Sequence, residues 1–288
     1  MMNVALVGFS TRARNIYRII DSLNNVNVKS ILRLHTESTS SKILDNTIVT
    51  NNFKEAVDSV DAVIIACHPS AHLNIVTKCI SIGVPIMIEN PVALSIVDYE
   101  RIFKMASMSG IPILVNHSNL FSSEFEALIS LTSSWYPIEI EYDVCNPGRI
   151  CDHSQLLDLG PESIIMASLV LKNFPEKICI RKIPSRTGEL FNIDMYSGSS
   201  SAKLSIGNSF SAKKRHFEVR CGKRFAIYNN IVKDKLIVDG YKMKFIPEDP
   251  IKRAILSLYK CVTSGEVDYK FSTVMNIKSI NNIFETFN

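Results

Sequence analysis

The sequence predicts an α/β protein with two domains: a doubly wound parallel sheet, and then an α+β domain with a mostly antiparallel open sheet. Up to residue 118, short apolar runs alternate with amphipathic segments of helical spacing, which is typical of a parallel sheet covered by helices on both faces. Beyond residue 121, closely spaced alternating segments are joined by turns, which is typical of antiparallel strands. A chain of 288 residues can bury two moderate cores. We therefore expect domains at residues 1–118 and 119–288.

The elements of the first domain follow from hydrophobic periodicity. The expected strands are Val4–Val7, Val28–Leu34, Ile48–Val49, Asp61–Ala66, Val84–Ile88 and Ile113–Val115. The expected helices are Thr11–Leu23, Phe53–Ser59, Ser70–Ile82 and Ser95–Ser109. Gly83 is the natural C-terminal stop of the third helix.

The second domain is predicted in the same way. Its expected helices are Ser123–Leu131, Leu156–Leu171, Asp249–Ser264 and Ser272–Phe287. Its expected strands are Ile138–Val144, Lys177–Ile183, Leu190–Ser197, Ala202–Ser209, His216–Cys221, Arg224–Tyr228 and Lys235–Val238.

Composition excludes several classes of protein. The hydrophobic fraction of 46% and the charged fraction of 21% are ordinary for a globular chain. No apolar run reaches the roughly 18–20 residues needed to cross a bilayer, and no basic segment precedes the first apolar run, so we expect a cytoplasmic protein without a membrane partner. The net charge of +4 is mild and argues against nucleic acid.

The seven cysteines are an odd number without a CxxC pair, which favours reduced thiols. Cys145 and Cys151 flank a Pro-Gly turn, but His153 alone does not complete a zinc site. We therefore expect no metal.

A glycine turn lies between the first strand and the first helix, in Gly8-Phe9-Ser10-Thr11-Arg12-Ala13. The dinucleotide fingerprint of a Rossmann domain is G-x-G-x-x-G/A, whose glycines let a pyrophosphate approach the helix N-terminus. Ser10 replaces the middle glycine here. The candidate cofactor-binding residues of this turn are Gly8, Ser10, Thr11, Arg12 and Ala13.

Arg33 lies near the end of the second strand, where NAD enzymes place an acid that binds the ribose hydroxyls. A cation at this position suits a 2′-phosphate, so we expect NADP, with NAD possible. The alternative is an arginine that only faces solvent.

Several ordered motifs resemble those of the Gfo/Idh/MocA oxidoreductases. They are Asp61-Ala62-Val63-Ile64-Ile65-Ala66-Cys67-His68-Pro69-Ser70-Ala71-His72, Glu89-Asn90-Pro91-Val92-Ala93, Val115-Asn116-His117 to Phe121, and Leu156-Leu157-Asp158-Leu159-Gly160-Pro161-Glu162. The resemblance implies that cofactor contacts come from Cys67, His68, Pro69, His72, Glu89, Asn90 and Pro91. Within this set, His68 is expected to contact the cofactor, His72 to pack its loop onto the following helix, and Cys67 to fill space.

Two positions depart from the family pattern in ways that matter for mechanism. The family's E-K-P lysine is Asn90 here, and its D-x-G-x-H histidine is Glu162. Leu120 also stands where the family often has arginine. Losing both ionisable groups removes the ordinary proton relay, which typically raises the reaction rate by roughly 10²–10⁴-fold.

The remaining candidates for proton transfer are Glu162, Asp158 and His117, with Asn90 as a hydrogen-bonding group. Asp158 lies one helical turn from Glu162, and two carboxylates so close can share a proton. The alternative for Asp158 is to cap or anchor its helix.

The resemblance implies an oxidoreductase that acts on a sugar, a nucleotide-sugar or an imine. Arg33 adds the expected preference for NADPH, and the departures at Asn90 and Glu162 add a non-standard proton donor. The alternative is a catalytically inactive family member that serves as a partner subunit or ligand-binding scaffold. Ser10, Asn90 and Glu162 favour this alternative, because each weakens a different part of the machinery. By resemblance we also expect a homodimer or homotetramer.

Overall fold

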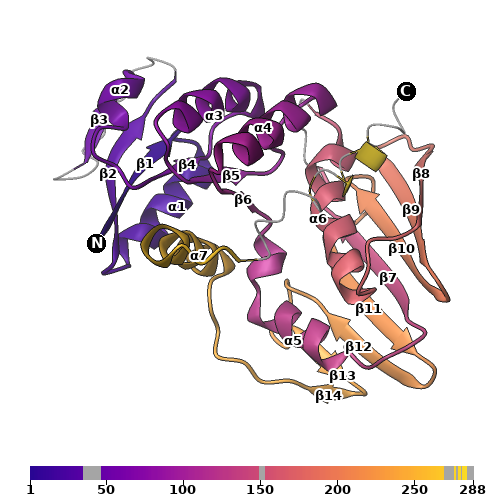
Figure 1. Ribbon diagram of the computed structural model, residues 1–288. Helices are drawn as coiled ribbons and strands as arrows, with labels where there is room; N and C mark the ends of the chain where they lie inside the picture. The colour runs from indigo at the N-terminus through magenta and orange to yellow at the C-terminus, as the bar shows by residue number, and fades with distance from the viewer. Residues whose placement is uncertain (35–46, 149–152, 269–275, 277, 280, 284–288) are drawn as a thin grey trace. The chain divides into compact units, whose positions relative to one another are not determined.

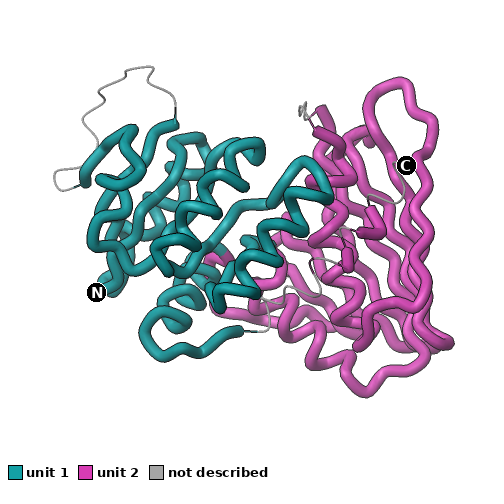
Figure 2. Tube along the Cα trace, turned by 45° about the horizontal axis from the view of Figure 1, so that its top comes forward, with its two compact units in different colours: residues 1–118, 251–273 teal, residues 119–250, 274–288 magenta. Residues whose placement is uncertain are grey.

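The computed structural model describes residues 1–34, 47–148, 153–268, 276, 278–279 and 281–283. The chain divides into two compact units (Figure 2). Unit 1 comprises Met1–Ser118 and Ile251–Thr273, and unit 2 comprises Asn119–Pro250 and Val274–Asn288.

Unit 1 contains a six-stranded parallel sheet in the order β3-β2-β1-β4-β5-β6. The strands are β1 (Met2–Val7), β2 (Val26–Leu32), β3 (Ile48–Thr50), β4 (Ala62–Ile65), β5 (Ile86–Glu89) and β6 (Ile113–Asn116). Most of their side chains are buried, because helices cover both faces of a sheet of this kind. The strand order reverses between β1 and β4, and α/β proteins bind ligands at the carboxyl edge beside such a switch point.

The helices of unit 1 alternate with these strands up to α4, as predicted, and α7 joins them from the end of the chain. They are α1 (Thr11–Asp21), α2 (Phe53–Ala56), η1 (Pro69–Ala71), α3 (His72–Ser81), α4 (Ile96–Ser109) and α7 (Pro250–Ser264). Helices α3 and α4 lie on one face of the sheet, and α1 and α7 lie on the other (Figure 1). Ser95 caps α4 by accepting a hydrogen bond of 3.1 Å from the amide of Asp98, as expected for a helix-starting serine.

Unit 2 contains an eight-stranded sheet in the order β14-β13-β12-β11-β7-β10-β9-β8. Its strands are β7 (Glu139–Cys145), β8 (Lys177–Ile183), β9 (Leu190–Ser197), β10 (Ser200–Gly207), β11 (Lys214–Cys221), β12 (Arg224–Tyr228), β13 (Leu236–Val238) and β14 (Tyr241–Lys242). Strands β7 and β10 are parallel, and the other neighbouring pairs are antiparallel. The predicted fold class, an α/β protein with a mostly antiparallel second sheet, is confirmed.

One face of this sheet is covered by two helices, α5 (Ser123–Leu131) and α6 (Gln155–Val170). Side chains alternate across the strands: in β7, Ile140 and Tyr142 are buried, whereas Glu139 and Glu141 are exposed. The opposite face therefore carries polar groups, as expected for an open sheet.

Helix α7 belongs to unit 1, although the sequence assigned it to the second domain. Its apolar face, comprising Ile251, Ala254, Ile255, Leu258 and Cys261, is buried. The end of this helix, the glycine that follows it and the segments before β5 and β6 line a depression of about 480 Å³ at the amino edge of the six-stranded sheet. An amphipathic pattern predicts a buried face but does not specify which sheet covers it, so chain order gave the wrong assignment.

Smaller differences concern the ends of elements. The expected helix Ser70–Ile82 is divided, because His68 starts the short helix η1 and α3 begins only at His72. Strand β14 was not predicted. In the expected final helix, residues 276, 278–279 and 281–283 are helical, and its other positions lie outside the described residues. Among the helices that the structure describes, none combines the length and apolar character of a membrane span.

Candidate functional site

The turn between β1 and α1 depends on Gly8. Its φ of +98° lies in a region that side chains disfavour, and an ideal Cβ there would lie 2.8 Å from the carbonyl oxygen of Ala66. The amide of Gly8 also donates a hydrogen bond of 2.9 Å to the carbonyl of Leu32. The turn therefore lies against the carboxyl ends of β2 and β4, the edge where a dinucleotide binds in this kind of sheet.

Ser10 is the N-cap of α1 rather than an open position. Its Oγ donates to the carbonyl of Ala66 at 3.3 Å and accepts from the amide of Ala13 at 3.4 Å. Helix geometry leaves the amides of Thr11 and Arg12 without an intrahelical acceptor. The replacement of glycine by serine therefore takes up one amide of the first turn, and these two amides and the positive helix end can still face an anion.

Arg12, in the first turn of α1, reaches across to the ends of β5 and β6. Its Nε lies 3.0 Å from Oε2 of Glu89, and its Nη2 donates a hydrogen bond of 3.0 Å to Oγ of Ser118. The Nε–H bond is not aligned with Oε2, so the contact with Glu89 is an ion pair rather than a directed hydrogen bond. The other oxygen of Glu89 accepts a hydrogen bond of 2.6 Å from Nδ2 of Asn116.

From the sequence, Arg12 and Glu89 are expected as separate cofactor contacts. Their ion pair is not predicted, and neither are the contacts that Asn116 and Ser118 make with them. A basic residue after β1 and an acidic residue at the end of β5 could have predicted the ion pair, because the carboxyl ends of parallel strands lie at the same edge of the sheet. The side chain of Glu89 is 13% exposed and that of Arg12 is 40% exposed. The part of this edge at β5 and β6 therefore carries an oriented, partly accessible cation, Arg12.

Two further arginines lie near the ring of Phe9. The Cζ atoms of Arg14 and Arg33 lie 4.9 Å and 6.0 Å from its centroid, within the range of cation–π attraction. Arg33 follows β2, and its amide donates to the carbonyl of Thr50 at 2.8 Å. Arg14 was missed, although one helical turn separates it from Ser10. The β2 side of the glycine turn thus carries two guanidinium groups.

The loop after β4 is fixed by His72, which is buried. Its Nδ1 lies 3.0 Å from the carbonyl oxygen of Val92, and its Nε2 lies 3.2 Å from that of Cys67. Burial lowers the pKa of His72, although the two carbonyl groups oppose this shift. These contacts tie the loop to the segment after β5, in agreement with a packing role.

The neighbouring loop residues are less suited to chemistry. Nδ1 of His68 accepts from the amide of Ser70 at 3.3 Å and lies 2.8 Å from its hydroxyl, just before Pro69 begins η1. Burial raises the pKa of Cys67 to about 11, so its thiolate is scarce at neutral pH. Cys67 is therefore unsuited to act as a nucleophile.

Asn90 and His117 follow β5 and β6 at the same carboxyl edge. The Asn90–Pro91 peptide bond is cis. His117 is 1% exposed, and its amide donates to the carbonyl of Val115 at 2.9 Å. In unit 1, the parallel topology therefore gathers the glycine turn, Glu89, Asn90 and His117 along one edge.

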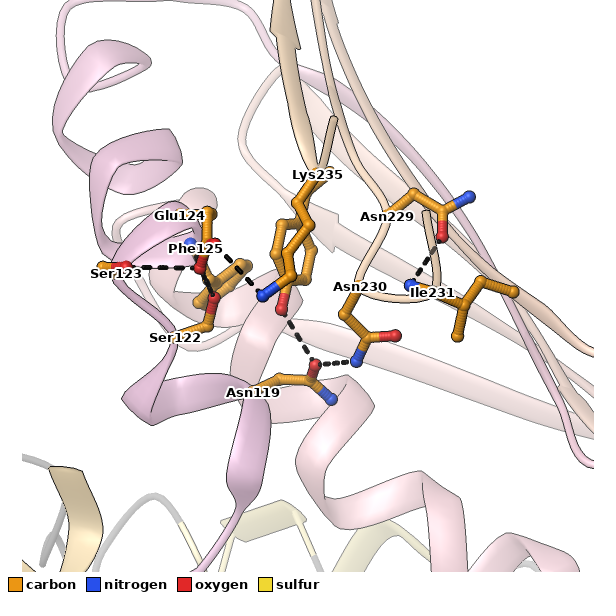
Figure 3. A network of polar contacts seen from close by, with 10 residues as sticks. Asn119, Ser122, Ser123, Glu124, Phe125, Asn229, Asn230, Ile231 and Lys235 are labelled. Atoms are coloured by element: carbon orange, nitrogen blue, oxygen red, sulfur yellow. Dashed lines mark hydrogen bonds and ion pairs between the residues drawn. The ribbon is translucent and has the colours of Figure 1, made fainter. Parts of the chain in front are cut away.

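In unit 2, Glu162 projects from α6 and is held by Asn119. The backbone amide of Asn119 donates a hydrogen bond of 2.7 Å to Oε1 of Glu162. The side-chain oxygen of Asn119 accepts from the hydroxyl of Tyr228 at 3.0 Å and from Nδ2 of Asn230 at 2.6 Å (Figure 3). Strand β12 and its connection to β13 thus fix the residue that orients the Glu162 carboxylate.

Figure 3 also shows Glu124, a buried carboxylate that sequence reasoning missed. It accepts a hydrogen bond of 2.6 Å from Oγ of Ser122 and pairs with Nζ of Lys235 at 3.1 Å. Burial is the largest influence and raises the pKa of Glu124, but the hydrogen bonds and Lys235 outweigh it, so the pKa is lowered overall. Glu124 joins α5 to β13.

Asp158 and Glu162 have partners of their own. Oδ1 of Asp158 lies 4.0 Å from Nε2 of His153, with the two side chains 7% and 12% exposed. This contact joins α6 to the segment just before it and is an ion pair only when His153 is protonated. The anchoring role and the proton shared with Glu162 both stay predictions. Cys151 lies outside the described residues, and the described residues contain no group of three metal-ligating side chains.

Comparisons with known proteins give a family model and a set of related folds. Residues 2–117 match the GFO_IDH_MocA model, described as an oxidoreductase family with an NAD-binding Rossmann fold. The sequence has no match among curated proteins.

Solved structures share the fold over nearly the whole chain. A UDP-N-acetylglucosamine 3-dehydrogenase from Acidithiobacillus ferrooxidans superposes with a TM-score of 0.85 at 13% identity, covering 99% of this chain and 96% of that one. An oxidoreductase from Thermotoga maritima gives 0.84 at 17% identity, with coverages of 97% and 93%. An aldose-aldose oxidoreductase from Caulobacter crescentus gives 0.82 at 15% identity, with coverages of 99% and 96%.

Proposed function

We propose that this chain, whose residues 2–117 belong to the Gfo/Idh/MocA oxidoreductase family, is an NADPH-preferring oxidoreductase of a small polar metabolite. The observation that carries the proposal is the turn at Gly8, where the missing side chain lets the start of α1 pack directly against the backbone at the carboxyl end of β4. A nicotinamide cofactor, when bound, supplies or accepts a hydride. The residues described below bind it, orient it and handle the accompanying proton.

The glycine turn fits a dinucleotide diphosphate. Thr11 and Arg12 offer backbone amides at the positive end of α1. Ser10 uses its own hydroxyl to cap the helix, so it withdraws the amide of Ala13 but does not remove the anion site.

The preference for NADPH rests on Arg33 and Arg14. Both guanidinium groups lie beside Phe9 at the β2 end of the carboxyl edge, where the adenosine ribose of a dinucleotide lies in Rossmann domains. A 2′-phosphate would accept charge-assisted hydrogen bonds there, and NADH has no such group.

Glu162 is the proposed proton donor and acceptor of the substrate. Its carboxylate is oriented by the Asn119 amide, and a carboxylate can exchange protons with a hydroxyl or an amine. Asn90 cannot do so at neutral pH, and His117 remains the second candidate. We propose a sugar, a nucleotide-sugar or an imine as the substrate, and the dehydrogenase from Acidithiobacillus ferrooxidans supports the nucleotide-sugar.

The decisive experiment is a titration of the full-length protein with NADPH and NADH, followed by reduced-nicotinamide fluorescence. Saturable binding with a clear preference for NADPH is expected. A protein that binds neither cofactor would contradict the proposal.

A non-catalytic scaffold is the second candidate function. Asn90, which follows β5 at the carboxyl edge, favours it, because an amide cannot exchange protons at neutral pH. Such a protein would bind cofactor but oxidise none of a panel of sugars and nucleotide-sugars.

We further propose a homodimer or homotetramer that uses the exposed face of the eight-stranded sheet, including Glu139 and Glu141. Light scattering of the purified protein tests this, and a monomeric mass would contradict it. The described cysteines are unpaired, and reduced thiols support a cytoplasmic location.

A further inference from the structure

The first turn of α1 sends guanidinium groups toward both halves of the carboxyl edge. Arg14 lies beside Phe9, near the end of β2. Arg12 instead reaches Glu89 and Ser118, after β5 and β6. If the adenosine half of a dinucleotide lies over β2, its nicotinamide half extends toward β4, β5 and β6. Arg12 therefore lies on the nicotinamide side of unit 1.

The contacts of Arg12 fix its orientation without enclosing it. They involve Nε and one N–H of Nη2, whereas a guanidinium has five N–H donors. Among the residues that the structure describes, no contact is found for Nη1, and 40% of the side chain is exposed. One edge of the guanidinium is thus held by protein, and the other edge can meet a ligand.

The partner of Arg12 is itself held firmly. The Glu89 carboxylate contacts Arg12 through Oε2 and Asn116 through Oε1, and only 13% of its side chain is exposed. A carboxylate tied at both oxygens is poorly placed to bind a ligand directly. Its effect is to orient the arginine.

The capping of α1 by Ser10 explains why a bound diphosphate would need a further hydrogen-bond donor such as Arg12. Ser10 takes up the amide of Ala13, which would otherwise face a bound anion. A guanidinium provides strong, charge-assisted hydrogen bonds to oxygen acceptors.

We propose that Arg12 binds the nicotinamide half of the cofactor, donating from its exposed edge to the diphosphate or the adjoining ribose, while Glu89 and Ser118 orient it. This inference rests on the proposed function and adds a specific binding residue to it. It assigns Arg12 a role separate from that of Arg14 and Arg33, which bind the other end.

The test measures the binding of three probes by calorimetry. Adenosine 2′,5′-bisphosphate carries the adenosine end with the first phosphate of the diphosphate. The probe 2′-phospho-ADP-ribose adds the second phosphate and the second ribose, and NADPH adds the nicotinamide. Arg12→Gln should weaken the binding of NADPH and of 2′-phospho-ADP-ribose by about 10- to 100-fold, which is the range for the loss of a hydrogen bond to a charged group. The Kd for adenosine 2′,5′-bisphosphate should stay within about twofold of the wild-type value.

Arg18→Gln is the matched control, because Arg18 lies in the last turn of the same helix and contacts Asn15. It should change none of the three affinities. Ser118→Ala provides a milder variant that keeps the ion pair and removes one orienting acceptor. It should weaken only the two longer probes, by about threefold, if Arg12→Gln proves too unstable to purify.

The outcomes separate the inference from the proposed function. If the wild-type protein binds all three probes and Arg12→Gln, or Ser118→Ala in its place, leaves every affinity unchanged, Arg12 is a structural residue and the inference fails alone. An equal loss for all three probes also overturns it, because that pattern reports a damaged fold. A wild-type protein that binds none of the probes overturns the cofactor proposal together with this inference.

Discussion

The backbone amide of Asn119 donates a 2.7 Å hydrogen bond to the Glu162 carboxylate, and this contact holds the principal candidate for proton transfer. Asn119 is in turn fixed by Tyr228 and Asn230, which both donate to its side-chain oxygen. The direction of the carboxylate therefore depends on a backbone donor whose residue is itself held by two side chains. The arrangement suits a group that must meet a substrate oxygen or nitrogen in one orientation.

The first prediction follows from this contact. Glu162→Gln keeps the shape of the side chain and its acceptor for the Asn119 amide, but it cannot exchange protons. We expect kcat to fall by about 10²–10⁴-fold, with NADPH affinity unchanged, in an assay of NADP⁺ reduction over a panel of sugars and nucleotide-sugars. Glu100→Gln, at an exposed position of α4, is the control and should retain full activity. Unchanged turnover in the Glu162 variant would remove this residue from the mechanism.

The second prediction concerns Gly8. An alanine there would adopt a φ of +98° and place its Cβ 2.8 Å from the carbonyl of Ala66. We expect Gly8→Ala to lower the free energy of unfolding by at least about 2 kcal/mol, as measured by urea denaturation, and to abolish cofactor binding.

Gly110→Ala is the matched control for this variant. Gly110 has a φ of +69°, but an added Cβ would meet no atom within 4 Å. It should cost only about 1 kcal/mol, from the left-handed backbone alone, and should leave NADPH binding intact. Equal effects at both positions would show that crowding at the glycine turn is unimportant.

The third prediction concerns cofactor preference. Replacing Arg33 or Arg14 by glutamine removes a cation beside Phe9. Each variant should raise the Kd for NADPH about tenfold and that for NADH less than twofold, because only NADPH carries the 2′-phosphate. Fluorescence titration measures both constants, and Arg18→Gln should behave as the wild type. Parallel losses of NADPH and NADH would contradict phosphate recognition.

The fourth prediction is a pH dependence of stability that arises at Glu124. Its pKa in the folded protein lies below the ordinary value of 4.5, so the unfolded chain binds the proton more readily. The stabilisation by Ser122 and Lys235 is therefore complete above about pH 4.5 and is lost as the pH falls through the folded pKa.

Glu124→Gln should remove this contribution, about 1–2 kcal/mol at pH 7. It should also flatten the decline in urea midpoint between pH 5 and about pH 3. Other carboxylates, including Glu189 and Glu218, keep lowered pKa values, so part of the decline persists. Glu100→Gln, at an exposed position of α4, serves as the control and should follow the wild-type curve. An identical decline in the Glu124 variant would contradict the assignment.

Much of the fold could be predicted from the sequence, because apolar periodicity reports local structure. The strands Lys177–Ile183, Leu190–Ser197 and Arg224–Tyr228 were predicted with their observed bounds. The parallel pairing of β7 with β10 could not be predicted. Pairing depends on contacts between distant segments, and a strand pattern does not name its neighbour.

The candidate site was less accessible to sequence reasoning. The glycine turn and the residues at the strand ends were found, because local motifs mark them. The pair of Arg12 with Glu89 and the contact of Asn119 with Glu162 join segments that are 77 and 43 positions apart in the chain. Side-chain direction decides such contacts, and a linear pattern does not contain it.

The return of α7 to unit 1 has a practical consequence for dissecting this protein. A recombinant fragment that stops after Ser118 would lack the helix whose apolar side includes Ile255 and Leu258. The partner surface of that helix would then meet water, and such a fragment should be prone to aggregation. A fragment intended to fold as unit 1 must instead join residues 1–118 directly to residues 251–273. The unit therefore cannot be obtained by cutting the chain at a single position.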